Sequence, residues 1–155
     1  MRGRIDARLA ELGIELPSPP APAASYVPFV AAAGLVFISG QVSLREGEAI
    51  KGVLGAGMDA AAGAAAARAC GINLLAQLRA ACGGDLDRVR RVVKLTGFVN
   101  SAPDFGEHPQ VINGCSDLMK EVFGEAIGAH ARSAVGMAAL PFGFAVEIEG
   151  IFEIA

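Results

Sequence analysis

Aromatic and histidine side chains are scarce in this sequence. It has no tryptophan, one tyrosine (Tyr26) and two histidines (His108 and His130). Proteins that stack single-stranded nucleic acid use several aromatic rings, and histidine-based metal sites need a spacing such as H-E-x-x-H. Neither pattern occurs here, so we expect no metal site and no stacking platform.

An excess of basic residues is also missing. The net charge is −3, whereas a general nucleic-acid-binding domain carries a basic face. Four basic residues cluster near the middle of the chain, and we interpret them as a solvated strand edge: Arg88, Arg90, Arg91 and Lys94. Nucleic acid is therefore not an expected partner.

Motifs for phosphate and dinucleotide cofactors are absent as well. The sequence contains no G-x-S-x-G, no G-x-G-x-x-G and no P-loop. The glycine-rich run GVLGAG at 52–57 follows no clear strand, so we interpret it as a loop. We expect no cofactor.

The cysteines and the N-terminus indicate a reducing, non-membrane location. Cys70, Cys82 and Cys115 are an odd number without C-x-x-C, which is typical of buried thiols in a reducing compartment. Residues 1–20 lack the apolar core of a signal peptide. Polar residues interrupt the alanine-rich run 56–82, so it does not predict a membrane span. We expect a cytoplasmic protein without a membrane partner.

Length and composition predict a single domain over 1–155. The chain has 155 residues, of which 53% are hydrophobic and 19% charged, which suits one buried core. Residues 1–24 predict a short helix over 3–13 and then a proline-rich arm, because prolines remove backbone donors. Residues 25–155 form the predicted core.

Hydrophobic periodicity predicts the elements of this core. Strands are expected over 26–32, 35–42 and 90–99, with a short strand near 45–50 in an otherwise loop-like stretch and Gly40 at a bulge or close approach. Two helices are expected, over 58–82 and 109–123. Their predicted inward stripes are Cys70, Leu74, Leu78 and Cys82 in the first, and Ile112, Cys115, Met119 and Val122 in the second. Gly63 and Gly71 suggest that the first helix packs closely on a sheet.

The segment 128–155 predicts two strands joined by a Pro-Phe-Gly turn. The second strand alternates: one face carries Val146, Ile148, Phe152 and Ile154, and the other carries Glu147, Glu149, Ile151 and Glu153. The element order predicts an α+β architecture with two helices on one face of a mixed sheet. The other face is half apolar, so we expect a partner subunit to cover it.

Several blocks together resemble the reactive-intermediate deaminases, the Rid or YjgF-like superfamily, in a longer bacterial form. They are SYVPFV, LVFISGQVS, VVKLTGFVNSAPDF, VINGCSDLMKEVFGEA and ARSAVGMAALP followed by VEIEGI. The resemblance runs from about Tyr26 to the end. It implies a chorismate-mutase-like fold that forms a homotrimer, with ligand clefts between subunits.

The resemblance also assigns candidate site residues. Arg132, in its A-R-S motif, would bind a substrate carboxylate, a task that suits a planar guanidinium. Glu147 would handle the attacking water, with Glu149 as an alternative. Four further positions fall on motifs that line the cleft: Tyr26, Ser39, Gly40 and Asn113.

Each candidate also has a structural interpretation. Arg132 could form an ion pair with Glu147 or Glu149, and the four lining residues could serve packing or turns. His130 is expected to be structural, although it lies two residues before Arg132 and could share its face. Ala134 stands where the family commonly has cysteine, and Gly136 where many deaminases carry glutamate.

Three functions follow from the resemblance. The first is cofactor-free hydrolysis of enamines and imines such as 2-aminoacrylate to 2-oxo acids and ammonia. The second is a non-catalytic trimeric module that binds a small carboxylate such as a 2-imino or 2-oxo acid, which the changes at Ala134 and Gly136 favour somewhat. The third, an endoribonuclease or translation inhibitor, is disfavoured because the basic cluster is small.

Overall fold

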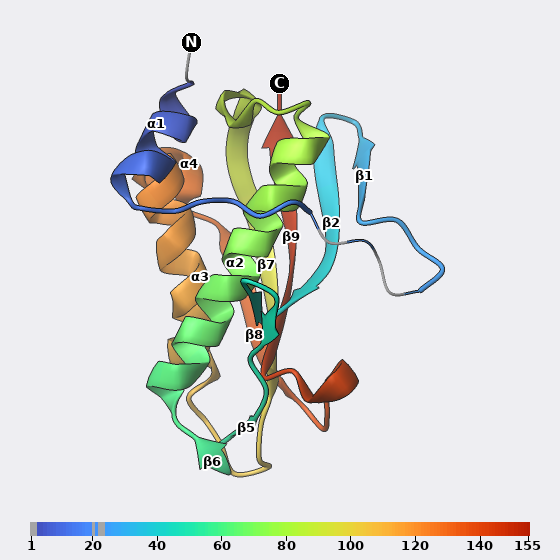
Figure 1. Ribbon diagram of the computed structural model, residues 1–155, viewed down its shortest axis with the longest axis vertical. Coiled ribbons are helices and arrows are strands. Elements are labelled where there is room, and N and C mark those ends of the chain that lie inside the picture. The colour runs from blue at the N-terminus through green and yellow to red at the C-terminus, as the bar shows by residue number, and fades with distance from the viewer. Residues whose placement is uncertain (1–2, 20, 22–23) are drawn as a thin grey trace.

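One mixed five-stranded sheet organises the chain. The structure, a computed structural model, describes residues 3–19, 21 and 24–155. In spatial order the strands are β1 (Phe29–Ala32), β2 (Leu35–Val42), β9 (Val146–Ile154), β7 (Val89–Asn100) and β8 (Ala131–Met137). The β7–β8 pair is parallel and the other pairs are antiparallel. Helices α2 (Ala60–Ala81) and α3 (His108–Phe123) cover one face (Figure 1), which confirms the predicted α+β architecture.

Short elements fill the connections. The first, α1 (Arg4–Glu11), confirms the predicted N-terminal helix. Two small pairs, β3 (Leu44–Arg45) with β4 (Glu48–Ala49) and β5 (Val53–Leu54) with β6 (Gly57–Met58), occupy the stretch expected to be loop with one strand. The 3-10 turn η2 (Pro141–Gly143) lies at the predicted Pro-Phe-Gly turn. The 3-10 turn η1 (Leu86–Arg88) and the helix α4 (Glu125–Gly128) were not predicted, because three or four residues show no periodicity.

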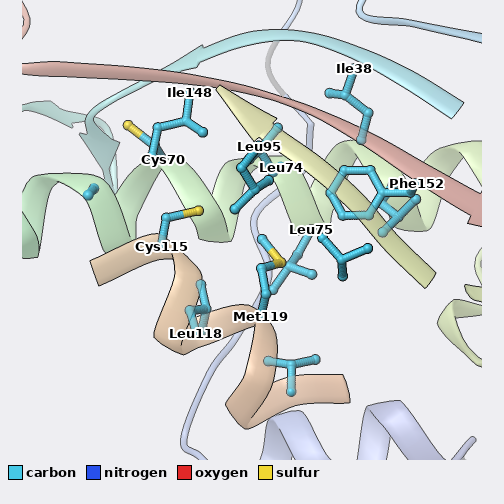
Figure 2. Packing of buried hydrophobic residues seen from close by; sticks show 14 of the residues in the cluster. Ile38, Cys70, Leu74, Leu75, Leu95, Cys115, Leu118, Met119, Ile148 and Phe152 are labelled. Carbon is cyan, nitrogen blue, oxygen red and sulfur yellow. The ribbon is translucent and has the colours of Figure 1, made fainter. Parts of the chain in front are cut away.

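The core lies between the sheet and the two long helices. The predicted inward stripes of α2 and α3 are buried along their whole length. They meet Leu95, Ile148 and Phe152 from the central strands β7 and β9 (Figure 2). All three cysteines are buried free thiols, as expected. Burial raises the pKa of the Cys115 thiol to about 12.

The glycines of α2 serve the contact between helices. A Cβ on Gly63 would meet side chains of Leu54 and Val111, and one on Gly71 would meet Leu118 and Cys115. The prediction that these glycines allow close packing is confirmed, but their neighbours come mainly from α3, whereas a sheet was expected.

The two C-terminal strands are not neighbours. β7 separates β8 from β9, because β8 pairs with one edge of β7 and β9 with the other. The two strands and the alternation of the second were predicted correctly, but the interpretation of Glu147 and Glu149 as lying on a strand next to Arg132 is wrong.

The N-terminal segment lies along the helical layer. After α1 the chain crosses α2 on its way to the β1 edge (Figure 1), and the described residues of the proline-rich arm form no helix or strand. Pro20 and Pro22, which were part of that prediction, lie outside the described residues. No helix in the described part of the chain has the length and apolar character needed to cross a membrane.

Candidate functional site

Arg132 is the centre of a polar cluster between β8 and α3. Its Nη1 donates to Asn113 Oδ1 at 2.8 Å and to Ser116 Oγ at 3.1 Å, and its Nη2 donates to the Pro109 carbonyl at 3.4 Å. Arg132 pairs with the core residue Leu95 across the β7–β8 ladder, so its side chain lies on the helical face. We call this group, together with His130, the Arg132 cluster.

His130 extends the cluster behind the arginine. Its Nδ1 lies 2.6 Å from the Gly128 carbonyl, and its Nε2 lies 2.9 Å from Ser116 Oγ. Because a carbonyl only accepts, Nδ1 must carry a proton, and in the neutral ring Nε2 then accepts from the Ser116 hydroxyl. Burial lowers the pKa of His130, and the charges of Arg132 and Lys120 lower it further. The neutral ring thus orients Ser116 so that its oxygen accepts from Arg132.

The charge of Arg132 is not balanced by a carboxylate. The ion pairs among the described residues involve Arg8, Arg68 and Lys120, and none involves Arg132. The proposed alternative of a pair with Glu147 or Glu149 is therefore wrong within one chain. All three partners of the guanidinium are neutral acceptors. Its Nε–H has no partner in the described part of the chain, so the Nε–Nη2 edge is available for two parallel bonds to a carboxylate.

Glu147 lies in a separate pocket. The pocket has a volume of about 690 Å³ and also contains Tyr26, Gly40 and Lys51. A Cβ on Gly40 would lie 2.9 Å from the carboxyl carbon of Glu147, so a side chain at this position would displace the carboxylate from where it lies. The register between β2 and β9 shifts between Ile38 and Gln41, which confirms the bulge or close approach predicted at Gly40.

The environment of Glu147 favours its protonated form. The carboxyl group is half-buried, and burial raises its pKa, with a smaller contribution from the nearby charge of Glu149. A carboxylate whose pKa is shifted toward neutrality holds a proton more readily, which suits a group that accepts one from water and returns it.

Ser39 supports the wall of this pocket. Its hydroxyl donates to the Val27 carbonyl at 2.8 Å, and its backbone N–H donates to the Pro28 carbonyl at 2.9 Å. These bonds fix the segment that carries Tyr26, whose ring is 49% exposed. The hydroxyl of Ser39 thus holds the chain in place, which agrees with the structural interpretation of this residue.

The six predicted site residues fall into two groups on opposite faces of the sheet. Arg132 and Asn113 belong to the helical face, whereas Glu147 points to the other face with Glu149 and Ile151. Strand β7 lies between the strands that carry Arg132 and Glu147. One chain therefore does not bring the arginine and the glutamate to the same ligand.

Two members of the Arg132 cluster were not predicted as site residues. Ser116 lies one helical turn after Asn113, and this polar pair at i and i+3 on an apolar helix was the available signal. His130 was expected to be structural, although the sequence spacing had placed it on the face of Arg132. The remaining histidine, His108, lies 3.2 Å from Ser101 Oγ instead.

Two of the four residues in the basic cluster of the middle segment are bonded to the backbone. Arg88 donates to the carbonyls of Cys82 and Ala155, and Arg91 donates to the carbonyl of Ala129. Among the described residues, no group of three or more histidine, cysteine, aspartate or glutamate side chains is placed to hold a metal ion.

Comparison with known proteins gives consistent matches over nearly the whole chain. A family profile described as "YjgF/chorismate_mutase-like, putative endoribonuclease" matches residues 6–147. Protein TCP17 from Trypanosoma cruzi is 50% identical over 153 residues, which cover 98% of this chain and 95% of that protein.

Two solved structures are similar over the same extent. Protein Atu1372 of Agrobacterium tumefaciens, described as having unknown function, is 49% identical with a TM-score of 0.90, covering 97% of this chain and 92% of that one. A "putative endoribonuclease" from Shewanella oneidensis MR-1 is 32% identical with a TM-score of 0.93, covering 98% of this chain and 100% of that one. The N-terminal helix and arm are thus included in the similarity.

Proposed function

We propose that this chain, which belongs to the YjgF/chorismate mutase-like family, hydrolyses reactive enamines and imines such as 2-aminoacrylate to 2-oxo acids and ammonia. The observation that carries this proposal is the state of Arg132. A partly buried guanidinium is held by three neutral acceptors and keeps one edge open. Such a group is suited to bind the carboxylate of a small ligand.

We propose further that the site is completed by a second copy of the chain in a homotrimer. The side chains of Arg132 and Glu147 lie on opposite faces of one sheet, so a shared ligand requires Arg132 of one subunit and Glu147 of another. The face of the sheet away from the helices exposes Val30, Phe37 and Val135, and an apolar face of this kind is suited to subunit contact.

The chemistry needs only a placed water and a proton carrier. With the substrate carboxylate bound by Arg132, water attacks the carbon of the protonated imine while Glu147 takes one of its protons. The new C–O bond gives a neutral tetrahedral carbinolamine. Glu147 then returns the proton to nitrogen and the C–N bond breaks. The C=O bond of the 2-oxo acid forms as the hydroxyl proton passes to the leaving ammonia, which departs as ammonium and leaves Glu147 ionised again. Holding the reactants together contributes about 7–11 kcal/mol to lowering such a barrier, and no cofactor takes part.

A second function uses the same geometry without turnover. A binding module for small carboxylates needs the Arg132 cluster but not Glu147. The changes at Ala134 and Gly136 favour this alternative, because residues common in deaminases are missing there. An RNA-cleaving role has less support, since Arg88 and Arg91 are bonded to backbone carbonyls. The three free thiols agree with a cytoplasmic location.

The test is ammonia release from imines that an amino-acid oxidase generates in the assay. We expect the wild type to accelerate release and Arg132→Ala to lose at least about tenfold, because charge-assisted hydrogen bonds are worth roughly 1.5–3 kcal/mol each. Arg68→Ala is the matched control, since Arg68 forms a surface ion pair with Glu121 at 3.1 Å. Equal rates for wild type and Arg132→Ala would refute the proposal, and carboxylate binding without any acceleration would favour the binding module.

A further inference from the structure

The turn between β8 and β9 contains a phenylalanine in an unfavourable position. Phe142 has φ of 56° and ψ of 15°, the left-handed region that bulky residues rarely adopt. Its side chain is 76% exposed, so the ring gains little from burial. Strain and exposure both oppose folding, and such a combination is a reason to look for a functional role.

The ring of Phe142 lines the Glu147 pocket. The apolar side chains of its lining include Tyr26, Pro28, Val42, Phe142 and Phe144. A pocket of about 690 Å³ lies in the range that suits ligands of drug-like size, and a three-carbon acid such as 2-aminoacrylate would occupy only a small part of it. The polar side chains of the lining include Gln41, Lys51, Asn73 and Glu147. The rings of Phe142 and Phe144 carry no group that can transfer a proton, so they have no part in the hydrolytic step.

We propose that Phe142 and Phe144 form a subsite for the substrate side chain, and that the preferred substrates are 2-imino acids with large branched or aromatic side chains. This inference rests on the proposed function. The imine carbon would lie at Glu147, with the carboxylate directed to Arg132 of the partner subunit. The side chain would then extend along these two rings, where its transfer from water is favourable.

The experiment compares 2-oxo acids, the products of the reaction, by calorimetry. The probes are pyruvate, 4-methyl-2-oxopentanoate and 3-phenylpyruvate. We expect wild type to bind the two larger acids at least about tenfold more tightly than pyruvate, since each buried methylene adds roughly 0.8 kcal/mol, or about fourfold.

Two variants of the same residue separate the ring from the turn. Phe142→Asn removes the ring and suits the left-handed backbone, because asparagine tolerates it. In this variant we expect the ratio of affinities for the larger acids and for pyruvate to fall by at least about fivefold. Its melting temperature should equal that of wild type or be higher. Phe142→Tyr keeps the ring and should keep the preference.

Four results would overturn the inference. Two concern wild type: it binds none of the three acids, or it binds the larger acids no more tightly than pyruvate. Two concern Phe142→Asn: it keeps the preference of wild type for the larger acids, or its oligomer dissociates, which would make the ring an assembly contact. Ammonia release by the same wild-type sample distinguishes these failures from failure of the proposed function, because hydrolysis of any imine leaves that function standing.

Discussion

Arg132 and Glu147 are each unusual in their electrostatic setting. Arg132 keeps its charge among neutral acceptors, and Glu147 is half-buried without a cation bonded to it in the described part of the chain. Burying a charge without a partner costs stability. The half-buried carboxylate of Glu147 therefore costs the isolated fold free energy that a ligand can recover, whereas three hydrogen bonds hold Arg132.

The substitution Glu147→Gln tests whether this carboxylate lowers the stability of the fold and supports activity. The folded-state pKa of Glu147 is raised. The protonated carboxyl therefore contributes its full stabilisation of the fold below the unfolded-state pKa. This contribution is lost as pH rises through the folded-state pKa. Glutamine imitates the protonated form. We therefore expect a higher melting temperature than wild type at pH 7 and no difference near pH 4, close to the ordinary pKa of about 4.3. Deaminase activity should fall by at least about 100-fold.

The control for this change is Glu153→Gln, because Glu153 lies on the same strand face but is exposed. It should leave both melting temperature and activity close to those of wild type. A Glu147→Gln variant that is less stable at pH 7, or as active as wild type, would contradict the assignment.

His130 predicts a pH dependence of stability. The pKa of His130 is lowered in the folded state. The contribution of the neutral ring to the stability of the fold is therefore complete above the unfolded-state pKa of about 6.5. It is lost as pH falls through the folded-state pKa. Three charged groups surround the His130 ring: Arg132 on β8, Lys120 on α3 and Arg91 on β7. Arg91 donates to the carbonyl of Ala129, the residue next to His130. Lys120 also lies 3.9 Å from the carboxylate of Glu125.

We expect His130→Asn to flatten the dependence of the unfolding free energy on pH between 7 and 5. The change in slope should lie well below the roughly 1.4 kcal/mol per pH unit of one full proton, because solvent screens the half-exposed ring. The measurement is urea unfolding over this range, with His108→Asn as the control. If the slope of the unfolding free energy against pH were the same in His130→Asn and in wild type, the ring would titrate alike in the folded and unfolded states.

At the scale of elements, the crossing of α2 and α3 is the tightest contact of the helical layer. A Cβ on Gly114 of α3 would lie 2.0 Å from the carbonyl oxygen of Ala64 on α2. Backbone cannot move aside as a flexible side chain can, so the two helices must separate. We expect Gly114→Ala to destabilise the protein by about 3 kcal/mol or more in urea unfolding.

Gly106→Ala is the matched control, because a Cβ there meets nothing within 4 Å. It should change the unfolding free energy by no more than about 0.5 kcal/mol. If the two substitutions were equally mild, the close crossing described for Gly114 would be incorrect. The crossing matters for function because α3 carries Asn113 and Ser116, which hold Arg132.

The elements themselves were largely predictable from sequence, and their pairing was not. The stripes of α2 and α3 and the alternation of β9 report local burial, which is a property of neighbouring residues. The insertion of β7 between β8 and β9 depends on contacts between distant segments, and no periodicity encodes it. This is why the ion pair of Arg132 with Glu147 or Glu149 was a reasonable alternative from sequence and is excluded by the sheet order.

The candidate site shows the same difference between features encoded locally in the sequence and features that arise only from the fold. Arg132, Glu147, Gly40 and Tyr26 were found through motif resemblance, and the structure adds how each is held. Ser116 and Phe142 were missed because their roles arise from geometry: one is the partner of two side chains, and the other has a left-handed backbone. Residue types alone do not reveal either feature.

At the scale of the whole molecule, the two half-sites are separate. A single chain presents Arg132 on the helical face of the sheet, whereas the side chain of Glu147 points to the other face. In a homotrimer with clefts between subunits, each cleft takes its arginine from one copy and its glutamate from the next. Two variants that are each inactive can then complement one another, which no site within one chain allows.

The most direct measurement is therefore the activity of mixed oligomers, made by co-expressing Arg132→Ala and Glu147→Gln chains with different tags and purifying on both tags. Light scattering establishes that these oligomers are trimers. In each mixed trimer about a third of the clefts, one of the three, would combine an intact arginine with an intact glutamate from neighbouring subunits. Mixed trimers should therefore recover up to about a third of wild-type ammonia release, whereas each variant alone stays well below that level. Mixed trimers as inactive as the separate variants, or monomers at micromolar concentration, would contradict it.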